Sequence, residues 1–162
     1  MKVWVLDTSP LIFLSSIQRL HLLRSSKRRL FVPEAMYSEA KQQPSKVPEE
    51  LNQALSSWIV TRKIRNERAL NILLANLHRG EAEAILLSQE CHAEFLVVHD
   101  LEARRYANRC GLVTIGTLGI LLAARLQGRI SSLREELEKL QKCGFYVKPS
   151  IRDAVLSEAG EA

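Results

Sequence analysis

Val3-Trp4-Val5-Leu6-Asp7-Thr8-Ser9-Pro10 opens the chain and carries the signals of a parallel α/β fold. The β-branched and aromatic run Val3–Leu6 predicts a short buried strand that ends at Asp7. Thr8, Ser9 and Pro10 then favour a helix start, because hydroxyl side chains cap helices and proline suits the first turn. A buried strand that passes directly into a helix is typical of a βαβ unit.

The same alternation continues along the chain. Apolar runs predict further strands at 30–32, 95–98 and 112–115, with Trp58-Ile59-Val60 as another short apolar stretch and Phe145-Tyr146-Val147 as an added edge strand. Periodic apolar residues predict helices between them. We therefore expect a three-layer α/β/α, Rossmann-like sandwich with a central, mostly parallel sheet of four to five strands.

Length and composition fit one compact domain. The 162 residues suffice for one core but not comfortably for two. We expect a single domain over 1–162, with a core over about 1–145 and a helical C-terminal extension over about 146–162. No apolar run approaches the roughly 20 residues that span a bilayer, and Asp7 interrupts any signal-peptide core. The sequence thus predicts a cytoplasmic protein with no membrane partner.

Cysteine content and charge narrow the class of partner. The three cysteines, Cys91, Cys110 and Cys143, form no CxxC pair, which argues against a zinc knuckle or a disulfide framework. The net charge of +5 and a pI of about 9.3 favour a polyanionic partner.

Four acidic residues follow the predicted strands or begin the predicted helices: Asp7, Glu39, Glu81 and Asp100. In open α/β sheets the functional crevice lies at the carboxyl ends of the strands, so these acids are expected at one edge. Clustered carboxylates repel one another and favour a divalent cation, and an all-oxygen donor set indicates Mg²⁺ or Mn²⁺. Such a site suits phosphodiester hydrolysis, in which a carboxylate not engaged with the metal serves as general base.

Each acid also has a structural alternative. Asp7 can cap the helix that follows it, and Glu81 lies in a first helical turn, where the helix dipole favours acids. Asp100 at a strand end can also be an ordinary structural residue, although it is the stronger candidate. Glu39 can be a solvated surface residue, and Glu83 is expected to face outward. The set of four is a stronger signal than any one member.

Five stretches together resemble a known family. They occur in the family's order and run from the start of the chain to about residue 145: Leu6–Leu11, Val32–Glu39, Gly80–Ile85, Asp100–Arg104 and Gly116–Leu121. On these the sequence is similar to the PIN-domain nucleases, named after the N-terminal domain of PilT-like proteins, and specifically to a prokaryotic VapC-like branch.

The resemblance implies a Rossmann-like sandwich that cleaves single-stranded RNA with Mg²⁺ or Mn²⁺. It implies that Asp7, Glu39, Glu81 and Asp100 are the catalytic, metal-holding residues. It also implies that Thr8 or Ser9 adds a hydroxyl near the first acid, and Thr117 falls in the matching Gly-Thr-Leu-Gly stretch. Relatives of this kind are often toxins blocked by a small antitoxin protein, and they commonly form homodimers.

The chain departs from the family at one place. Relatives tend to carry two acids where this chain has His99-Asp100, and the Asp-x-x-Ala-Arg pattern places the ligand at Asp100. Three roles stay open for His99: it weakens metal binding, adds a cation beside the phosphate, or serves a structural purpose. Arg104 matches the family's arginine and either meets a phosphate, holds the acids in place or forms a structural ion pair.

Further RNA contacts are predicted at basic side chains. The candidates are Arg104, Arg105, Lys27 and Arg28, although charge runs usually mark a solvated face.

Three functional hypotheses remain from the sequence. The first is a metal-dependent endoribonuclease, the toxin of a toxin–antitoxin pair. The second is a PIN-like RNA- or protein-binding module with weak catalysis, which the substitution at His99 favours. The third is a phosphoacceptor receiver domain, ranked below because the first strand lacks an acidic pair and no lysine ends a late strand.

Overall fold

The computed structural model describes residues 1–162 apart from the side chain of Pro44, and its centre is one parallel sheet. The strands are β1 (Lys2–Leu6), β2 (Arg28–Pro33), β3 (Ile59–Arg62), β4 (Phe95–Val97) and β5 (Thr114–Ile115). Their order is β3-β2-β1-β4-β5, and every neighbouring pair is parallel. The predicted α/β/α class is confirmed. The short apolar stretch Trp58-Ile59-Val60 contributes the first two residues of β3.

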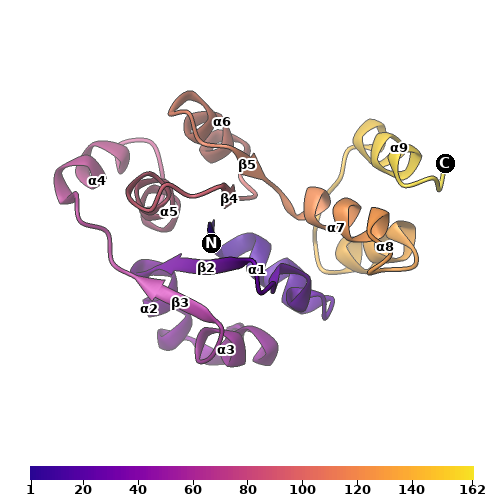
Figure 1. The fold of residues 1–162 in the computed structure, drawn as a ribbon, viewed down its shortest axis with the longest axis horizontal. Helices are drawn as coiled ribbons and strands as arrows, with labels where there is room; N and C mark the ends of the chain where they lie inside the picture. The colour runs from indigo at the N-terminus through magenta and orange to yellow at the C-terminus, as the bar shows by residue number, and fades with distance from the viewer.

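Helices connect successive strands and cover both faces of the sheet (Figure 1). They are α1 (Thr8–Ser16), α2 (Glu34–Gln42), α3 (Glu49–Leu55), α4 (Glu67–Leu73), α5 (Arg79–Glu90), α6 (Leu101–Arg109), α7 (Thr117–Leu126), α8 (Leu133–Lys142) and α9 (Pro149–Glu158). Short 3-10 turns lie at Leu20–Leu23 and Pro44–Lys46.

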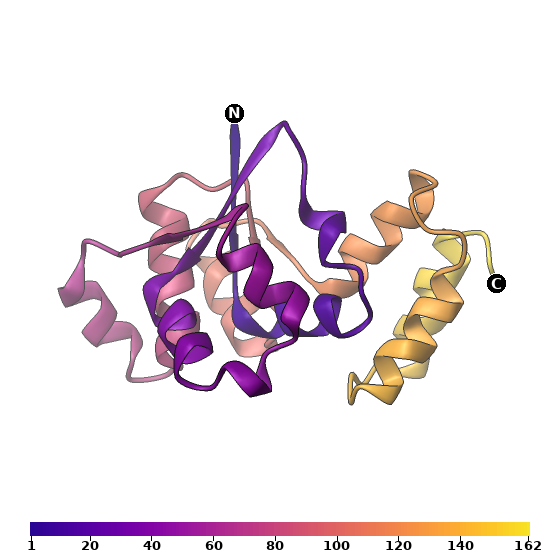
Figure 2. The same ribbon diagram turned by 90° about the horizontal axis from the view of Figure 1, so that it is seen from below.

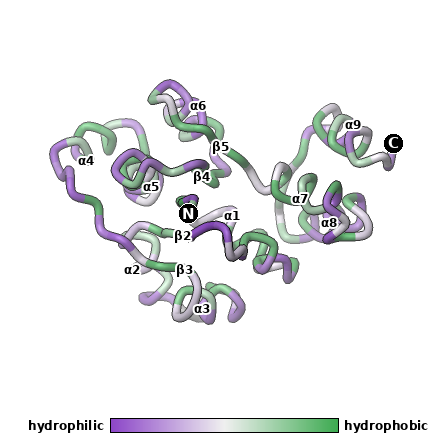
Figure 3. The backbone as a smooth tube through the Cα atoms, viewed as in Figure 1, coloured by the Kyte–Doolittle hydropathy of each residue, from purple (hydrophilic) through white to green (hydrophobic). Residues whose placement is uncertain are grey.

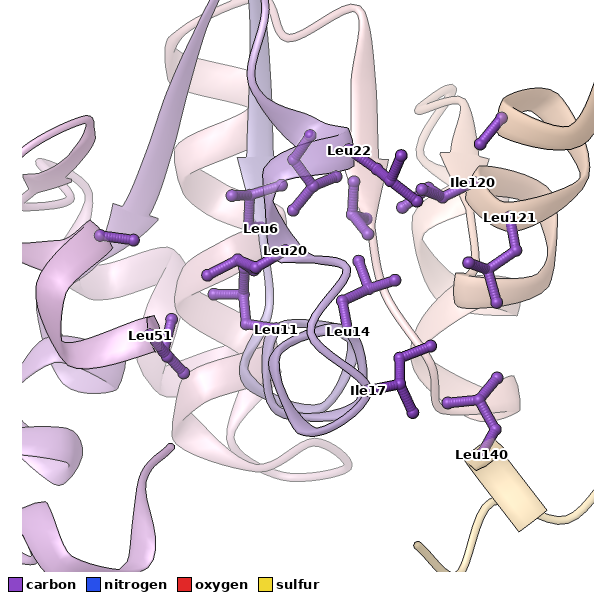
Figure 4. Close-up of a cluster of buried hydrophobic side chains, with 14 of the residues drawn as sticks. Leu6, Leu11, Leu14, Ile17, Leu20, Leu22, Leu51, Ile120, Leu121 and Leu140 are labelled. Carbon is purple, nitrogen blue, oxygen red and sulfur yellow. The ribbon is translucent and has the colours of Figure 1, made fainter. Parts of the chain in front are cut away.

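Successive side chains of the central strands point to opposite faces of the sheet and contribute to two separate hydrophobic cores. Leu6 and Val97 face a cluster that includes residues of α1, α3, α7 and α8 (Figure 4). Val5 and Leu96, one position earlier on the same strands, face a second cluster built with α4, α5 and α6. Because successive side chains of a strand point to opposite faces, two apolar neighbours on β1 are enough to require helices on both sides.

The C-terminal helices lie at one end of the molecule. Figures 1 and 2 show α8 and α9 beyond α7, at the end opposite α4. In Figure 3, α8 carries both hydrophobic and hydrophilic residues, as expected for a helix with one buried face. The predicted boundary at residue 145 falls in the segment between α8 and α9.

Two predicted elements differ in the structure. Helical spacing after Thr8 continues to Leu23 in the sequence, but α1 ends at Ser16, because Gln18 adopts a φ of 60° and the chain turns. The edge strand predicted at 145–147 is wrong: Phe145 instead packs its ring against Phe13, 4.8 Å between centroids. No described helix combines the length and apolar character needed to cross a membrane.

Candidate active site

The carboxyl ends of β1 and β4 place two aspartates at the same edge of the sheet. Asp7 directly follows β1, and its backbone N–H donates a 2.9 Å hydrogen bond to the carbonyl of Val97 on β4. Asp100 lies three residues beyond β4, at the start of α6. In Figure 2 the N-terminus lies at the upper edge of the sheet and α1 begins at the lower edge, which is the edge that carries these acids.

Two glutamates reach this edge from helices. Glu81 lies in the first turn of α5, and a Cβ added at the preceding Gly80 would stand 3.9 Å from Asp7 Oδ1. The start of α5 therefore closely approaches the Asp7 carboxylate. Glu39 is exposed on α2 and lines a cleft of about 420 Å³ together with Lys63 and Arg79.

The pKa of Asp7 reports how these groups interact. The pKa of Asp7 is raised from 3.8 to about 6. Burial is the largest cause, and the negative charges of Glu81, Glu39 and Asp100 act in the same direction, in that order. A hydrogen bond from the Thr8 N–H opposes the rise. Burial likewise raises the pKa of Glu81, with Asp100 adding to the shift. Glu39, Glu81 and Asp100 are therefore each close enough to Asp7 for their charges to act on it.

The capping alternative applies unequally to these acids. The Asp100 carboxylate accepts a 3.0 Å bond from the Ala103 N–H and thus caps α6. One Glu81 oxygen accepts a 3.3 Å bond from the His78 N–H in a capping box. Asp7 holds the cap position of α1, yet its side chain makes no bond to the N–H groups deeper in that first turn. Capping therefore accounts for one oxygen of Asp100 and one of Glu81, but not for the burial of Asp7.

None of the four carboxylates is neutralised by the protein. Within the described residues, no Lys, Arg or His nitrogen lies within 4.0 Å of an oxygen of Asp7, Glu39, Glu81 or Asp100. Asp7 is only 5% exposed, so water compensates little of its charge. A buried carboxylate beside three others is a strong site for an external cation.

The donor chemistry fits a hard divalent ion, although the geometry is open. All four side chains offer oxygen, which Mg²⁺ and Mn²⁺ prefer. In the described part of the chain, no three His, Cys, Asp or Glu side chains are already placed around a common point at metal-binding distance. A cation would therefore draw the carboxylates together by replacing their mutual repulsion with attraction.

The hydroxyl candidates lie near the acids. Thr8 is half-buried and Ser9 exposed in the first turn of α1. Thr117 is buried at the start of α7, and its Oγ1 has no hydrogen-bond partner within the described residues. An unsatisfied buried hydroxyl is costly, so Thr117 is a feature that the packing alone does not explain.

His99 is held by aromatic packing beside the acids. Its ring lies 5.2 Å from that of Phe13 and 5.0 Å from that of Phe145, between centroids. Burial lowers the pKa of His99, Asp100 opposes this and Arg104 adds to it. A histidine with a lowered pKa, packed edge-on or tilted against two aromatic rings, agrees with a structural purpose rather than with an added cation.

The two neighbouring arginines differ. Arg105 pairs with Glu102 at 3.3 Å on the surface. Arg104 has no carboxylate partner in the described residues, and its Nη1 would lie only 3.1 Å from a Cβ added at Gly116. The structural ion pair suggested for Arg104 is therefore not present, and its guanidinium lies beside the backbone that leads from β5 into α7.

Lys27 and Arg28 lie away from the carboxylates. Arg28 begins β2 and is in register with Lys2 at the amino ends of the parallel strands, opposite the edge with Asp7. Its guanidinium stacks 3.8 Å from the centroid of Trp4. An RNA contact at these residues thus belongs to a different edge of the sheet.

Glu83 was expected to face outward, and this is wrong. It is 4% exposed, accepts a 3.2 Å bond from the Ala35 N–H at the start of α2, and pairs with Arg79 at 3.0 Å. Its surroundings explain the error: every residue from 82 to 88 is buried, so α5 has no outward face there. The dense apolar run around Glu83 in the sequence was the signal that could have indicated its burial.

Comparison with known proteins identifies the family. A family model described as DUF3368, a PIN domain, matches residues 3–161. The chain belongs to the PIN-domain family. PIN domains are generally nucleases and typically use divalent metal ions.

A solved structure supports this PIN fold. The chain is similar to a PilT N-terminus domain protein, SSO1118, from the hyperthermophilic archaeon Sulfolobus solfataricus P2, with a TM-score of 0.58 and 20% identity. The similarity covers 75% of this chain and 92% of the other. At that identity it is evidence for the fold alone. The comparison with curated proteins gives no match.

Proposed function

We propose that this PIN domain is a metal-dependent endoribonuclease that hydrolyses phosphodiester bonds in single-stranded RNA. One observation carries the proposal: Asp7 is buried, has no cation partner among the described residues, and interacts with Glu39, Glu81 and Asp100 at the carboxyl edge of the sheet. RNA is the substrate implied by the family resemblance, and the net charge of +5 suits a polyanion.

The four carboxylates would hold Mg²⁺ or Mn²⁺, which supplies a water of lowered pKa and neutralises charge on the leaving oxygen. Glu81 retains one oxygen beyond its capping bond, and burial raises its pKa, so it is suited to accept a proton from the attacking water. Arg104, which has no carboxylate partner in the described residues, is suited to bind a phosphate oxygen of the substrate.

The test compares wild type with Asp7→Asn on 5′-labelled single-stranded and hairpin RNA, with Mn²⁺ or with EDTA. Cleavage is expected only for wild type with Mn²⁺ and mainly on the single strand. Glu102→Gln is the matched control, because Glu102 is an exposed acid two residues from Asp100 that pairs with Arg105. Equal cleavage by wild type and Asp7→Asn would assign the activity to a contaminant or another site.

A second candidate is a PIN-like RNA-binding module with weak catalysis. The observation that favours it is the open arrangement of the acids, in which no three donors of the described residues are already placed for a metal. RNA binding by wild type without cleavage at any Mn²⁺ concentration would select this candidate. The antitoxin partner, the homodimer and the cytoplasmic location stay predictions from the sequence.

A further inference from the structure

A second cavity lies next to the acidic edge. It has a volume of about 580 Å³ and runs between the β5–α7 turn and the segment that leads from α8 into α9. We call it the β5–α9 groove; its lining includes His99, Arg104, Gly116, Tyr146, Lys148 and Ile151. His99 lines the groove and directly precedes Asp100, so the groove adjoins the edge of the sheet that carries the four carboxylates. Its volume lies within the range of small-ligand pockets, roughly 300–1,000 Å³.

The charge of the groove is opposite to that of the neighbouring edge. Arg104 and Lys148 line it, and no aspartate or glutamate does. In the described part of the chain neither cation has a carboxylate within 4.0 Å. Two unpaired cations on an apolar wall favour an anionic occupant with an apolar part.

The apolar part of the wall is aromatic. Tyr146 is 77% exposed, and its ring makes none of the close ring contacts that join Phe13, His99 and Phe145. Ile151, 47% exposed on α9, adds an apolar surface nearby. A free tyrosine ring beside unpaired cations is the combination on which unpaired bases stack, with the phosphate on the cation.

We propose that the β5–α9 groove is a nucleotide subsite, which binds the nucleotide next to the scissile phosphate of a single-stranded RNA. The base stacks on Tyr146, and the phosphate binds Arg104 and Lys148. This inference rests on the proposed nuclease function and adds a reason for single-strand preference, because a paired base cannot present its face to the ring. It also assigns substrate recognition to the C-terminal extension, which supplies Tyr146 and Lys148.

The experiment measures binding separately from cleavage. A 5′-labelled hexamer of single-stranded RNA is titrated by fluorescence anisotropy with EDTA present, against wild type, Tyr146→Ala and Tyr146→Phe. Tyr146→Ala is expected to weaken binding by about tenfold, and Tyr146→Phe to restore it, because stacking needs the ring and not the hydroxyl. Arg104→Lys is expected to weaken binding with an intermediate effect, since it keeps the charge and loses the planar guanidinium.

Two controls keep the result specific. Ile72→Ala removes a 72% exposed apolar side chain on α4, at the other end of the molecule, and should leave binding unchanged. The Tyr146 variants should melt at the wild-type temperature, because the ring is mostly in solvent. Unchanged affinity in Tyr146→Ala overturns the subsite. A change from dimer to monomer with unchanged RNA affinity also overturns it and assigns the groove to contact between copies.

A parallel cleavage assay with Mn²⁺ separates the two proposals. Tyr146-dependent binding without cleavage by wild type retains the groove as a nucleotide-binding site and rejects the nuclease function, and with it the position next to a scissile phosphate. Cleavage by wild type together with wild-type binding and cleavage by Tyr146→Ala retains the nuclease and rejects the subsite.

Discussion

Asp7 and Glu136 are both buried carboxylates, 5% and 2% exposed, and they differ in what surrounds them. Glu136 on α8 pairs through Oε1 with Arg19 at 2.8 Å and Lys139 at 3.4 Å, and so ties α8 to the end of α1. Asp7 faces other carboxylates and has no such partner. The fold neutralises the acid that joins its helices and leaves the acid at the strand edge uncompensated. That difference indicates that Asp7 serves a ligand rather than the fold.

The largest effect on cleavage is expected when the charge of Asp7 is removed. Asp7→Asn should reduce RNA cleavage at least 100-fold, a loss of about 2.7 kcal/mol of transition-state stabilisation. It should leave the melting temperature unchanged or raised, since it removes a buried charge without a partner. Steady-state cleavage rates and thermal denaturation measure the two quantities.

Glu136→Gln should show the converse behaviour. It leaves Arg19 without its carboxylate, and because that arginine is 29% exposed, we expect a loss of about 1–3 kcal/mol, less than for a fully buried pair. Cleavage by the folded fraction should stay at the wild-type rate. A Glu136→Gln variant that is inactive but as stable as wild type would show that Glu136 serves the site rather than the fold, which contradicts the comparison with Asp7.

The comparison predicts an unusual dependence of stability on pH. With EDTA present, Asp7 has a folded pKa of about 6, raised above its ordinary value of 3.8. Between these values the folded state binds the proton that the unfolded state has released, so stability falls as pH rises through about 4 to 6. The size is roughly 3 kcal/mol at most. Urea denaturation at several pH values should show a larger fall in wild type than in Asp7→Asn, in which only the raised pKa of Glu81 still contributes.

A metal ion should reverse that dependence. Because only the ionised carboxylates bind the cation, Mn²⁺ should raise the melting temperature of wild type more at pH 7.5 than at pH 5. The same rise at both values would show that the ion binds elsewhere.

A finer comparison uses two glutamates of one helix. Glu81→Gln should weaken Mn²⁺ binding and leave stability nearly unchanged. Glu83→Gln should lower stability by about 1 kcal/mol, because it weakens the contacts with Arg79 and the Ala35 N–H, and should keep most of the Mn²⁺ affinity. Calorimetric titration and thermal melts measure the pair, and equal effects would show that Glu83 belongs to the metal site.

The smallest effect is expected at the amino edge of the sheet. Arg28→Ala removes a guanidinium stacked on Trp4 and should cost about 0.5–1 kcal/mol of stability, with no change in Mn²⁺ affinity. Loss of RNA affinity in this variant would support the RNA contact predicted at Lys27 and Arg28.

The edge with the acids was predictable because its signal is local. An apolar strand that ends in an acid, as at Leu6-Asp7, fixes both the burial of the strand and the place of the carboxylate. Parallel strands place their carboxyl ends at one edge of the sheet, and the structure makes β1 and β4 direct neighbours there. The predicted helices also offered Glu39 and Glu81 as candidates, and the family resemblance then implied that all four acids hold the metal.

Other features depend on contacts that the sequence does not display. The turn after α1 rests on a positive φ at Gln18, a residue with no marked preference for that conformation. The segment 145–147 has strand-like residues, but β5, the last strand of the sheet, is only two residues long. Phe145 packs on Phe13 and His99 instead, and Tyr146 is exposed. The groove lined by Tyr146 likewise joins residues far apart in the chain.

The most direct test of the account is the binding of Mn²⁺ to the protein without RNA, followed by isothermal titration calorimetry at pH 7.5 for wild type and Asp7→Asn. We expect wild type to bind Mn²⁺, with an affinity that falls at least tenfold in Asp7→Asn and is unchanged in Glu136→Gln. Equal affinity of wild type and Asp7→Asn, or no binding to either, would contradict the claim that these four carboxylates form a divalent-metal site.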